Sequence, residues 1–376
     1  MRNILITGGA GFIGSNLTIN LVKKGYNITI LDNLSKQVHG ENQQSKLYNS
    51  IKDICTFIFG DVCNRSDWQR ALNGQDAVVH LAAETGTAQS MYEITRYNEV
   101  NIIGTSHLLN ILANENHTVQ KMIIASSRSI YGEGKYFCKN HGNVYPFDRK
   151  EKDLLNGYFD PKCPFCKEIL ELKPTDETSS IQPLSIYGIT KHQQEKMILL
   201  MGKVLNIPSV VLRYQNVYGP GQSLTNPYTG VLSIFSTRLL NGNDLDIYED
   251  GEGIRDFVYI DDVVNATIMA LEKSEANNKV FNVGSGHPTS INKVANTLYD
   301  LYDSKGDINI SGKFRLGDIR HNYADLKKIS ETLGFSPKID FKTGVQRFVN
   351  WVKTQKLPED KYEKSINQLK TKGLMK

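Results

Sequence analysis

The sequence of 376 residues lacks any apolar run long enough for a membrane helix. Such a helix needs roughly 18 or more consecutive apolar residues. The N-terminus also lacks the long apolar core and small-residue cleavage site of a signal peptide. We therefore expect no membrane anchor and a cytoplasmic location.

The sequence also lacks a large excess of charge of one sign, because it has 44 basic and 40 acidic residues. No basic stripe of the kind that nucleic acid would need runs along the chain. The local excess of lysine in residues 353–376 is interpreted as a solvated terminal helix rather than a binding arm. The composition predicts a folded protein without a nucleic-acid partner.

Cysteine is scarce, with five residues, and disulfides are not expected in a cytosolic chain. Three of the five lie with a histidine in residues 134–182, as Cys138-x-x-His141 and Cys163-Pro-Phe-Cys166. Two such pairs supply four ligands for a tetrahedral zinc, and four protein ligands leave no open position for catalysis. We expect a structural zinc that orders this segment. Unligated thiols in a loop are the alternative.

The N-terminal stretch RNILITGGAGFIGSNLTINLVKKGYNITILDN reads as a strand, a glycine turn, a helix and a second strand. Gly8, Gly11 and Gly14 lie three apart in the turn, where backbone amides can approach a pyrophosphate at the helix N-terminus. Asp32 ends the second strand, where its carboxylate can accept bonds from the ribose hydroxyls of adenosine. The unit predicts a dinucleotide site that favours NAD over NADP. A purely structural turn is the alternative.

Further apolar strands follow at TFIFGDV, DAVVHLAA, KMIIASS and SVVLRYQNVYG, with helical stretches between most of them. This alternation is typical of a parallel sheet covered by helices on both faces. Ligands bind such sheets at the carboxyl ends of the strands, which places Asp61, residues 81–83 and Ser127 beside the cofactor. The expected fold class is α/β, a Rossmann-like doubly wound parallel sheet.

A candidate catalytic group combines the end of one strand with the start of one helix. Tyr187 and Lys191 are four residues apart in an amphipathic stretch and therefore share a helix face. An ammonium near a phenol favours the phenolate, which suits Tyr187 for proton transfer. Ser127 would hydrogen-bond the same reacting oxygen. The pattern Tyr-x-x-x-Lys often occurs by chance on helices. Downstream of a dinucleotide-binding unit, however, it indicates a catalytic pair.

In this order, TGGAGFIG, HLAA, the serine before Tyr131, YGITK, LRYQNVYGPG and RDFVYIDD resemble the extended short-chain dehydrogenase/reductase family of nucleotide-sugar enzymes. The resemblance covers essentially the whole chain. It implies an NAD-binding Rossmann domain at residues 1–216, interrupted by the 134–182 insertion. It further implies a smaller α+β domain for the sugar nucleotide at residues 217–376, with segments near 255–275 returning to the first domain.

The resemblance also implies which residues bind the two ligands. For the cofactor they are Gly8, Gly11, Phe12, Ile13, Gly14, Asp32, Asn33, Asp61, Val62, Leu81, Ala82, Ala83, Asn101, Tyr187, Lys191 and Tyr214. For the substrate they are Thr85, Arg128, Asn216, Arg255, Arg315 and Asp318. A guanidinium fork suits the oxygens of a diphosphate. For Arg255 and Arg315 a structural salt bridge is the alternative.

The two positions after Ser127 separate the reactions of this family. Family dehydratases resemble TDEVYG there, with an acid and a base, whereas this chain has Arg128 and Ser129. A guanidinium stays protonated and cannot deprotonate carbon. Tyr187 is then the single acid/base in view, which favours a 4-epimerase that passes hydride to NAD and back through a 4-keto sugar. The cofactor need not leave such an enzyme. A reductase needs the same residues and is the alternative.

A narrower resemblance rests on HLAAETGTAQSMYE, SSRSIYGEG, the two Cys/His pairs, PTDE and LRYQNVYGPGQSLTNPYTGVLSIFS. These segments resemble dTDP-L-rhamnose 4-epimerases, which interconvert dTDP-L-rhamnose and dTDP-6-deoxy-L-talose. The resemblance implies a role in polysaccharide biosynthesis, tightly bound NAD and a homodimer. A UDP-sugar 4-epimerase, an unusual dehydratase and a non-catalytic sugar-nucleotide binder are the alternatives.

Overall fold

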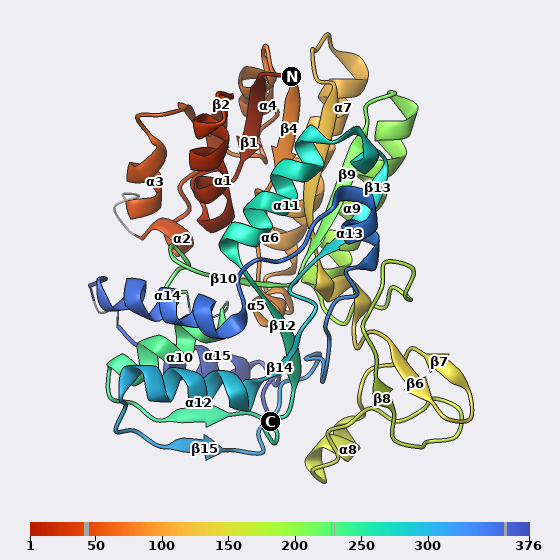
Figure 1. Ribbon diagram of the computed structural model, residues 1–376, viewed down its shortest axis with the longest axis vertical. Helices are drawn as coiled ribbons and strands as arrows, with labels where there is room; N and C mark the ends of the chain where they lie inside the picture. The colour runs from red at the N-terminus through yellow and green to blue at the C-terminus, as the bar shows by residue number, and fades with distance from the viewer. Residues whose placement is uncertain (41–44, 227, 229, 357–358) are drawn as a thin grey trace.

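The computed structural model describes residues 1–40, 45–226, 228, 230–356 and 359–376. Its centre is a seven-stranded sheet in which every neighbouring pair is parallel (Figure 1). The strands lie in the order β13-β9-β5-β4-β1-β2-β3. They span β1 (Asn3–Thr7), β2 (Asn27–Asp32), β3 (Thr56–Phe59), β4 (Ala77–His80), β5 (Lys121–Ser127), β9 (Ser209–Tyr214) and β13 (Lys279–Val283).

Helices cover both faces of this sheet, which explains why its strands are apolar along most of their length. In β1, Ile4 and Ile6 face one core and Leu5 faces the other, because successive side chains of a strand point to opposite faces. The first core includes side chains of α1 (Phe12–Lys23) and α11 (Ile260–Glu272). The second includes side chains of α4 (Arg65–Leu72), α7 (Gly104–Asn114) and α9 (Ile186–Val204).

The order of the strands reverses beside β1. From β1 the chain first adds β2 and β3 on one side, and then β4, β5, β9 and β13 on the other. A crevice for ligands opens outside the carboxyl ends of the strands at such a reversal. The predicted doubly wound, Rossmann-like α/β sheet is confirmed.

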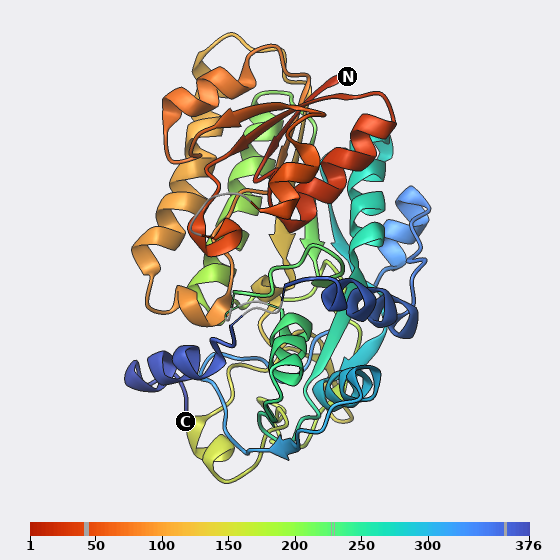
Figure 2. The same ribbon diagram turned by 90° about the vertical axis from the view of Figure 1, so that its left-hand side faces the viewer.

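The C-terminal part is built from small sheets and amphipathic helices below the central sheet (Figures 1 and 2). One sheet joins β10, β12 and β14, and β11 pairs with β15. The chain returns to the central sheet through α11 and β13, so the return extends beyond residues 255–275. The bounds are β10 (Asn216–Tyr218), β11 (Leu245–Ile247), β12 (Ile254–Tyr259), β14 (Pro288–Ser290), β15 (Ile308–Ile310), α10 (Val231–Leu240), α12 (Ile291–Tyr302), α13 (Lys327–Leu333), α14 (Phe341–Lys353) and α15 (Tyr362–Thr371).

The predicted insertion forms a small body of its own between β5 and α9 (Figure 1, yellow). It contains an antiparallel sheet of β7 (Gly142–Val144), β6 (Tyr136–Cys138) and β8 (Glu171–Leu172), and the helix α8 (Glu151–Leu155). The remaining short elements are α2 (Lys36–His39), α3 (Lys46–Ile51), α5 (Thr87–Ser90), α6 (Ile94–Asn98), the π-helical turn η1 (Glu99–Ile103) and the 3₁₀ turns η2 (Arg128–Tyr131) and η3 (Ser274–Ala276). Within the described ranges, no helix is both long and apolar enough to cross a membrane.

Candidate active site

A cavity of about 620 Å³ lies at the carboxyl ends of the central strands and continues into the C-terminal part. It brings together residues that are far apart in the sequence. Every predicted cofactor and substrate residue lines it except Asn101. These residues are Gly8, Gly11, Phe12, Ile13, Gly14, Asp32, Asn33, Asp61, Val62, Leu81, Ala82, Ala83, Thr85, Ser127, Arg128, Tyr187, Lys191, Tyr214, Asn216, Arg255, Arg315 and Asp318.

The glycine turn between β1 and α1 leaves no room for side chains at two of its positions. Gly8 has φ +67°, and a Cβ there would lie 2.7 Å from the backbone nitrogen of Ala82. A Cβ on Gly14 would lie 2.4 Å from the carbonyl oxygen of Gly8. The turn therefore packs tightly onto the start of α1 and opens its amides to the cavity. This cradle fits the pyrophosphate of a dinucleotide.

Asp32 ends β2 at the edge of the cavity. Its carboxylate accepts hydrogen bonds from the backbone nitrogens of Ala10 at 3.0 Å and Leu34 at 2.9 Å. Burial raises the pKa of Asp32, and these bonds oppose that shift. Each carboxylate oxygen keeps a further lone pair, so the group can also accept bonds from ribose hydroxyls. The backbone amides of the glycine turn and the carboxylate of Asp32 together fit NAD.

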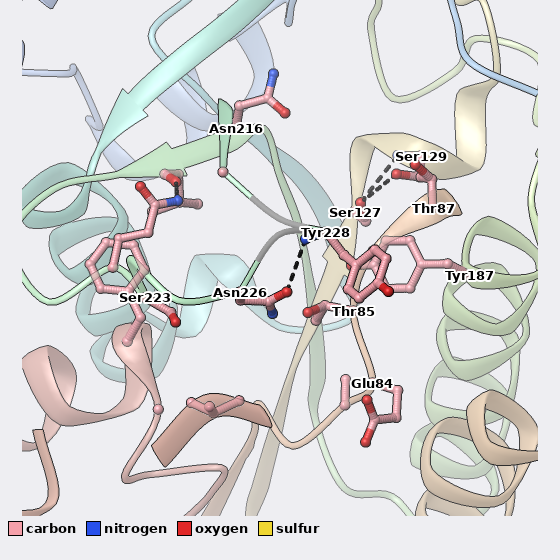
Figure 3. A pocket seen from close by; sticks show the side chains of 18 of the residues that line it. Glu84, Thr85, Thr87, Ser127, Ser129, Tyr187, Asn216, Ser223, Asn226 and Tyr228 are labelled. Atoms are coloured by element: carbon pink, nitrogen blue, oxygen red, sulfur yellow. Dashed lines mark hydrogen bonds between the residues drawn. The ribbon is translucent and has the colours of Figure 1, made fainter. Parts of the chain in front are cut away.

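Ser127, Tyr187 and Lys191 meet at one wall of the cavity. Ser127 is the last residue of β5, and its hydroxyl lies 3.1 Å from that of Ser129. The Ser185 hydroxyl caps α9 by accepting from the nitrogen of Gly188 at 3.1 Å, which starts the helix one residue before Tyr187. Figure 3 shows Tyr187 pointing from α9 into the cavity, toward the end of β5.

Burial disfavours the charged forms of both Tyr187 and Lys191. Burial raises the pKa of Tyr187, while the Ser127 hydroxyl and the Arg128 charge lower it less. Burial lowers the pKa of Lys191 to about 7, and its ammonium donates to the carbonyl of Ala125 at 3.0 Å. Lys191 therefore has access to both its neutral and its charged form near neutral pH, whereas Tyr187 is held as the neutral phenol.

Arginines gather at the other end of the cavity around one carboxylate. Asp318 pairs with Arg315 at 2.8 Å. Burial alone would raise the pKa of Asp318, but Arg315, Arg255, Arg149 and Arg128 together hold it below its usual range. Arg255 donates to backbone carbonyls and has no ion pair within the described residues. This arrangement offers positive charge to a diphosphate.

Arg128 brings a further guanidinium beside Tyr187. Its Nε donates to the Asn216 side-chain oxygen at 3.3 Å. Burial and the neighbouring charge of Arg255 lower the pKa of Arg128 to about 9, so the group stays protonated at neutral pH. Ser129 occupies the second position after Ser127. Neither Arg128 nor Ser129 can act as a base at neutral pH.

Asn101 is not among the residues that line the cavity, and its contact with the cofactor stays a prediction. Its side chain is fully buried. The amide donates to the Thr190 hydroxyl at 3.0 Å and to the Glu84 carbonyl at 3.1 Å, and its oxygen accepts from the Glu84 nitrogen. Asn101 thus joins η1 to α9 and to the loop after β4.

The cavity also has lining residues that sequence reasoning did not single out. The helix α15 contributes Tyr362 and Ile366, although residues 353–376 were expected to be solvated. That expectation is wrong for this helix, because its apolar side chains pack against Tyr248 and Ile234 while its lysines face outward. Its spacing of apolar residues was the available signal. The other unassigned residues include Thr87, Asn226 and Tyr228, which Figure 3 labels.

The Cys/His pairs of the insertion converge on one point. The ligand atoms of Cys138, His141, Cys163 and Cys166 all lie within 4.8 Å of one another. Cys138 Sγ is 3.5 Å from both His141 Nδ1 and Cys166 Sγ, and Cys163 Sγ is 3.6 Å from His141 Nδ1. A tetrahedral zinc with bonds of about 2.0–2.3 Å separates its ligand atoms by about 3.5–3.8 Å. The donor set therefore fits zinc.

Comparison with known proteins matches residues 4–153 and 166–284 to the NAD dependent epimerase/dehydratase family. The dTDP-L-rhamnose 4-epimerase of Burkholderia thailandensis is 34% identical over 93% of this chain and 95% of its own. The crystal structure of a Thermotoga maritima UDP-glucose 4-epimerase with UDP-glucose has a TM-score of 0.75 and 32% identity, covering 94% of this chain and 99% of that one.

A Bacillus cereus UDP-glucuronic acid 4-epimerase, solved with UDP-glucuronic acid and NAD, has a TM-score of 0.75 and 27% identity over 94% of this chain and 99% of that one. The family match covers more than half of the chain, and the fold and the glycine cradle agree with it. The chain belongs to the NAD dependent epimerase/dehydratase family and is an NAD-dependent enzyme among its nucleotide-sugar epimerases.

Proposed function

We propose that this enzyme is a 4-epimerase that interconverts dTDP-L-rhamnose and dTDP-6-deoxy-L-talose through a 4-keto sugar. One observation carries the proposal. Ser127, Tyr187 and Lys191 open on the same cavity as the glycine turn, and the side chains beside Ser127 are not bases. Such a site removes and returns one hydrogen at one carbon without a second acid/base.

The reaction uses three side chains in named roles. NAD, held by the glycine turn and Asp32, would supply the acceptor and the donor for the hydride of carbon 4. Tyr187 takes the proton of the 4-hydroxyl and later returns it, and Ser127 hydrogen-bonds the same oxygen. The Ser127 hydroxyl and the Arg128 charge favour the phenolate, and Lys191 in its charged form would add to them. The keto sugar must turn between the two hydride steps, so that hydride returns to its other face.

Elimination of water is disfavoured by the residues that surround Tyr187. A dehydratase needs an acid and a base where this chain has Arg128 and Ser129. Glu84, the carboxylate that Figure 3 labels, is ion-paired with Arg96 at 2.7 Å and hydrogen-bonds nothing else in the cavity. Burial raises the pKa of Glu84, and the pairing with Arg96 opposes that rise.

The choice of sugar nucleotide rests on a relative. The Burkholderia enzyme named for dTDP-L-rhamnose shares 34% of its residues with this chain. A UDP-sugar 4-epimerase is the second candidate, because the Thermotoga enzyme is 32% identical and was solved with UDP-glucose.

The test is to incubate the purified protein, without added cofactor, with dTDP-L-rhamnose and in parallel with UDP-glucose and UDP-glucuronic acid. Products are separated by liquid chromatography and weighed by mass spectrometry. The proposal expects a new peak of unchanged mass from dTDP-L-rhamnose. Loss of water would contradict the epimerase, and a new peak from a UDP-sugar alone would favour the second candidate.

The Cys/His cluster is proposed to hold a structural zinc. Three separations between its ligand atoms are 3.5–3.6 Å, as at a tetrahedral zinc site, and backbone N–H groups of Cys166 and Phe165 donate to Cys163. Burial opposes these donors, yet the pKa of Cys163 falls to about 6, which suits a thiolate ligand. Four protein ligands close the coordination sphere, so the metal would order the insertion and take no part in hydride transfer.

The enzyme is further proposed to act as a homodimer through α9. Ile189, Leu200 and Val204 are about half exposed or more, and at 100° per residue they lie within about 60° of one another on α9. Ile103 on the adjacent η1 is exposed as well. The stripe that they form also carries the exposed Gln193 and Lys196, and exposed apolar side chains gathered on one helix face favour contact with a partner. The cytoplasmic location and the role in polysaccharide biosynthesis stay predictions.

A further inference from the structure

The span between the two Cys/His pairs reaches out of the insertion and contacts the substrate end of the cavity. Residues 142–162 lie between His141 and Cys163, so the cluster joins both ends of this span. Both views place α8, which lies in the span, next to the C-terminus of the chain (Figures 1 and 2). Lys376 pairs there with Glu151 of α8 at 3.3 Å.

Arg149 is the first of two side chains of this span that hydrogen-bond to the loop 315–321. It is only 5% exposed. Its Nε lies 3.1 Å from Glu133 and its Nη1 lies 2.8 Å from Glu249, so it is paired with two carboxylates. Its Nη2 donates to the backbone carbonyl of Asp318 at 2.9 Å. One guanidinium therefore joins the insertion to the segment that follows Ser127 and to the loop 315–321.

Asp160 is the second of these side chains. It accepts from Arg320 Nε at 2.9 Å. Arg320 is 2% exposed, pairs with Asp250 at 2.6 Å and donates its backbone nitrogen to Glu133 at 2.8 Å. The loop 315–321 is thus held from its backbone and from its side chains at once.

The loop that these contacts hold also carries Arg315 and Asp318. Arg255 donates to the carbonyls of Ile319 and Arg320, both at 2.8 Å, and completes the support of the loop from the side of β12. Hydrogen bonds from a buried guanidinium are among the stronger ones in proteins, and their geometry is fixed by the planar fork. The position of Asp318 in the cavity therefore depends on where Arg149 stands.

A bound metal would restrict the span that carries Arg149. A span of this length with free ends loses conformational entropy when its side chains dock, and closing the loop at both ends removes part of that cost beforehand. The insertion would then be rigid where it meets the loop 315–321.

We propose that Arg149 is a positioning residue for nucleotide binding, and that the Cys/His cluster keeps it in place. The inference rests on the proposed function, in that Arg315 and Asp318 bind the nucleoside diphosphate. The insertion then acts as a clamp on the nucleotide end of the cavity. It has no part in binding NAD, whose cradle is formed by the glycine turn and Asp32 on the opposite side.

The test compares Arg149→Lys and Arg149→Met with Lys150→Met, an exposed neighbour that makes none of these contacts. Isothermal titration gives the dissociation constants of dTDP and UDP, and acid release gives the NAD content of each protein. Both Arg149 variants should weaken nucleoside diphosphate binding by about tenfold or more, because a charged hydrogen bond is lost. KM should rise with little change in kcat, and NAD content should stay at the wild-type level.

Three samples keep the test decisive if Arg149→Met does not fold: Arg149→Lys, Asp160→Asn and the wild type treated with a zinc chelator. Arg149→Lys keeps the charge between Glu133 and Glu249 but loses the fork that reaches Asp318. Asp160→Asn alters a half-exposed partner of Arg320. The wild type treated with a zinc chelator should show the same weaker nucleotide binding with its NAD retained.

Wild-type affinity in folded Arg149→Lys and in the chelated protein would overturn the inference. Equal loss of NAD and nucleotide in these samples would also overturn it, because that result indicates a general role in folding. A wild type that holds NAD but binds neither dTDP nor UDP would instead contradict the proposed function, and the inference with it.

Discussion

Tyr187 lies in a setting that opposes its charge. It is partly buried at the cavity wall, and burial raises its pKa. The groups that lower the pKa are the Ser127 hydroxyl and the Arg128 guanidinium, which come from the end of β5 and the turn after it. The position after Ser127 therefore supplies charge to the reacting end of the cavity, whereas a dehydratase has an acid there.

Replacing Tyr187 by phenylalanine should remove the acid/base and leave the fold unchanged. We expect kcat to fall by about 10²–10⁴-fold, because proton transfer by a positioned side chain contributes about that factor. Steady-state kinetics and circular dichroism measure both effects. Tyr158→Phe is the matched control, because Tyr158 is exposed on the insertion. A Tyr187→Phe enzyme with wild-type kcat would support the non-catalytic binder.

Lys191 predicts a dependence of stability on pH. Burial lowers its pKa from 10.5 to about 7 in the folded chain, so the unfolded chain binds more protons between these two values. The free energy of unfolding should therefore increase with pH over this window, by at most about 1.4 kcal/mol per pH unit from this group. Urea unfolding at about pH 7 and pH 9 should show a smaller increase for Lys191→Met. Equal increases in the two proteins would contradict the lowered pKa.

Residues that act within one short motif could be predicted from the sequence. The glycines, Ser127, Tyr187 and Lys191 were found because their spacing along one turn or one helix fixes their geometry, and they line one cavity. The place of Asn101 could not be predicted in the same way, because its partners Thr190 and Glu84 come from two other elements. No local pattern encodes such a contact.

At the scale of elements, the insertion between β5 and α9 is held mainly by polar contacts and by the Cys/His cluster. Its own apolar cluster is small and includes the ligand candidates Cys138 and Cys163. A body with so little buried apolar surface depends on another source of order, which a metal supplies.

The purified protein should contain about one zinc per chain by elemental analysis. Cys166→Ser should lose the metal and lower the thermal midpoint, because the ends of the span 142–162 are then no longer joined. Cys55→Ser is the control, because Cys55 lies far from the cluster in sequence and outside it in space. Absence of any bound metal in protein purified without chelators would contradict the zinc proposal.

Six strands of the central sheet were predictable as elements because they are apolar runs, most of them buried on both faces. The seventh strand, β13, was not assigned, although VFNV is apolar, because its place beside β9 is set by a return of the chain through α11. The prediction of a solvated helix for the lysine-rich C-terminal segment was wrong for a related reason. Its lysines are exposed, but Tyr362, Ile366 and Leu369 form a buried face against the rest of the chain.

At the scale of the whole molecule, the exposed stripe on α9 predicts a dimer. Light scattering after gel filtration should give twice the chain mass of 42.3 kDa. Leu200→Glu combined with Val204→Glu should give a monomer, because charges in an apolar interface are left without partners. Leu155→Glu is the control, because Leu155 is equally exposed on the insertion. A wild-type monomer, or a dimer that survives both changes, would contradict the proposal.

In the proposed reaction, hydride leaves and returns at carbon 4 of the sugar while NAD stays bound to the enzyme. The most direct measurement supplies dTDP-L-rhamnose with deuterium at carbon 4 to the purified enzyme in ordinary water, without added cofactor. The isomeric product should keep its deuterium, because in the proposed reaction the same hydride returns to the other face of the sugar. Loss of the deuterium to water would contradict it, since the carbon would then exchange a proton, and no reaction without added NADPH would indicate a reductase.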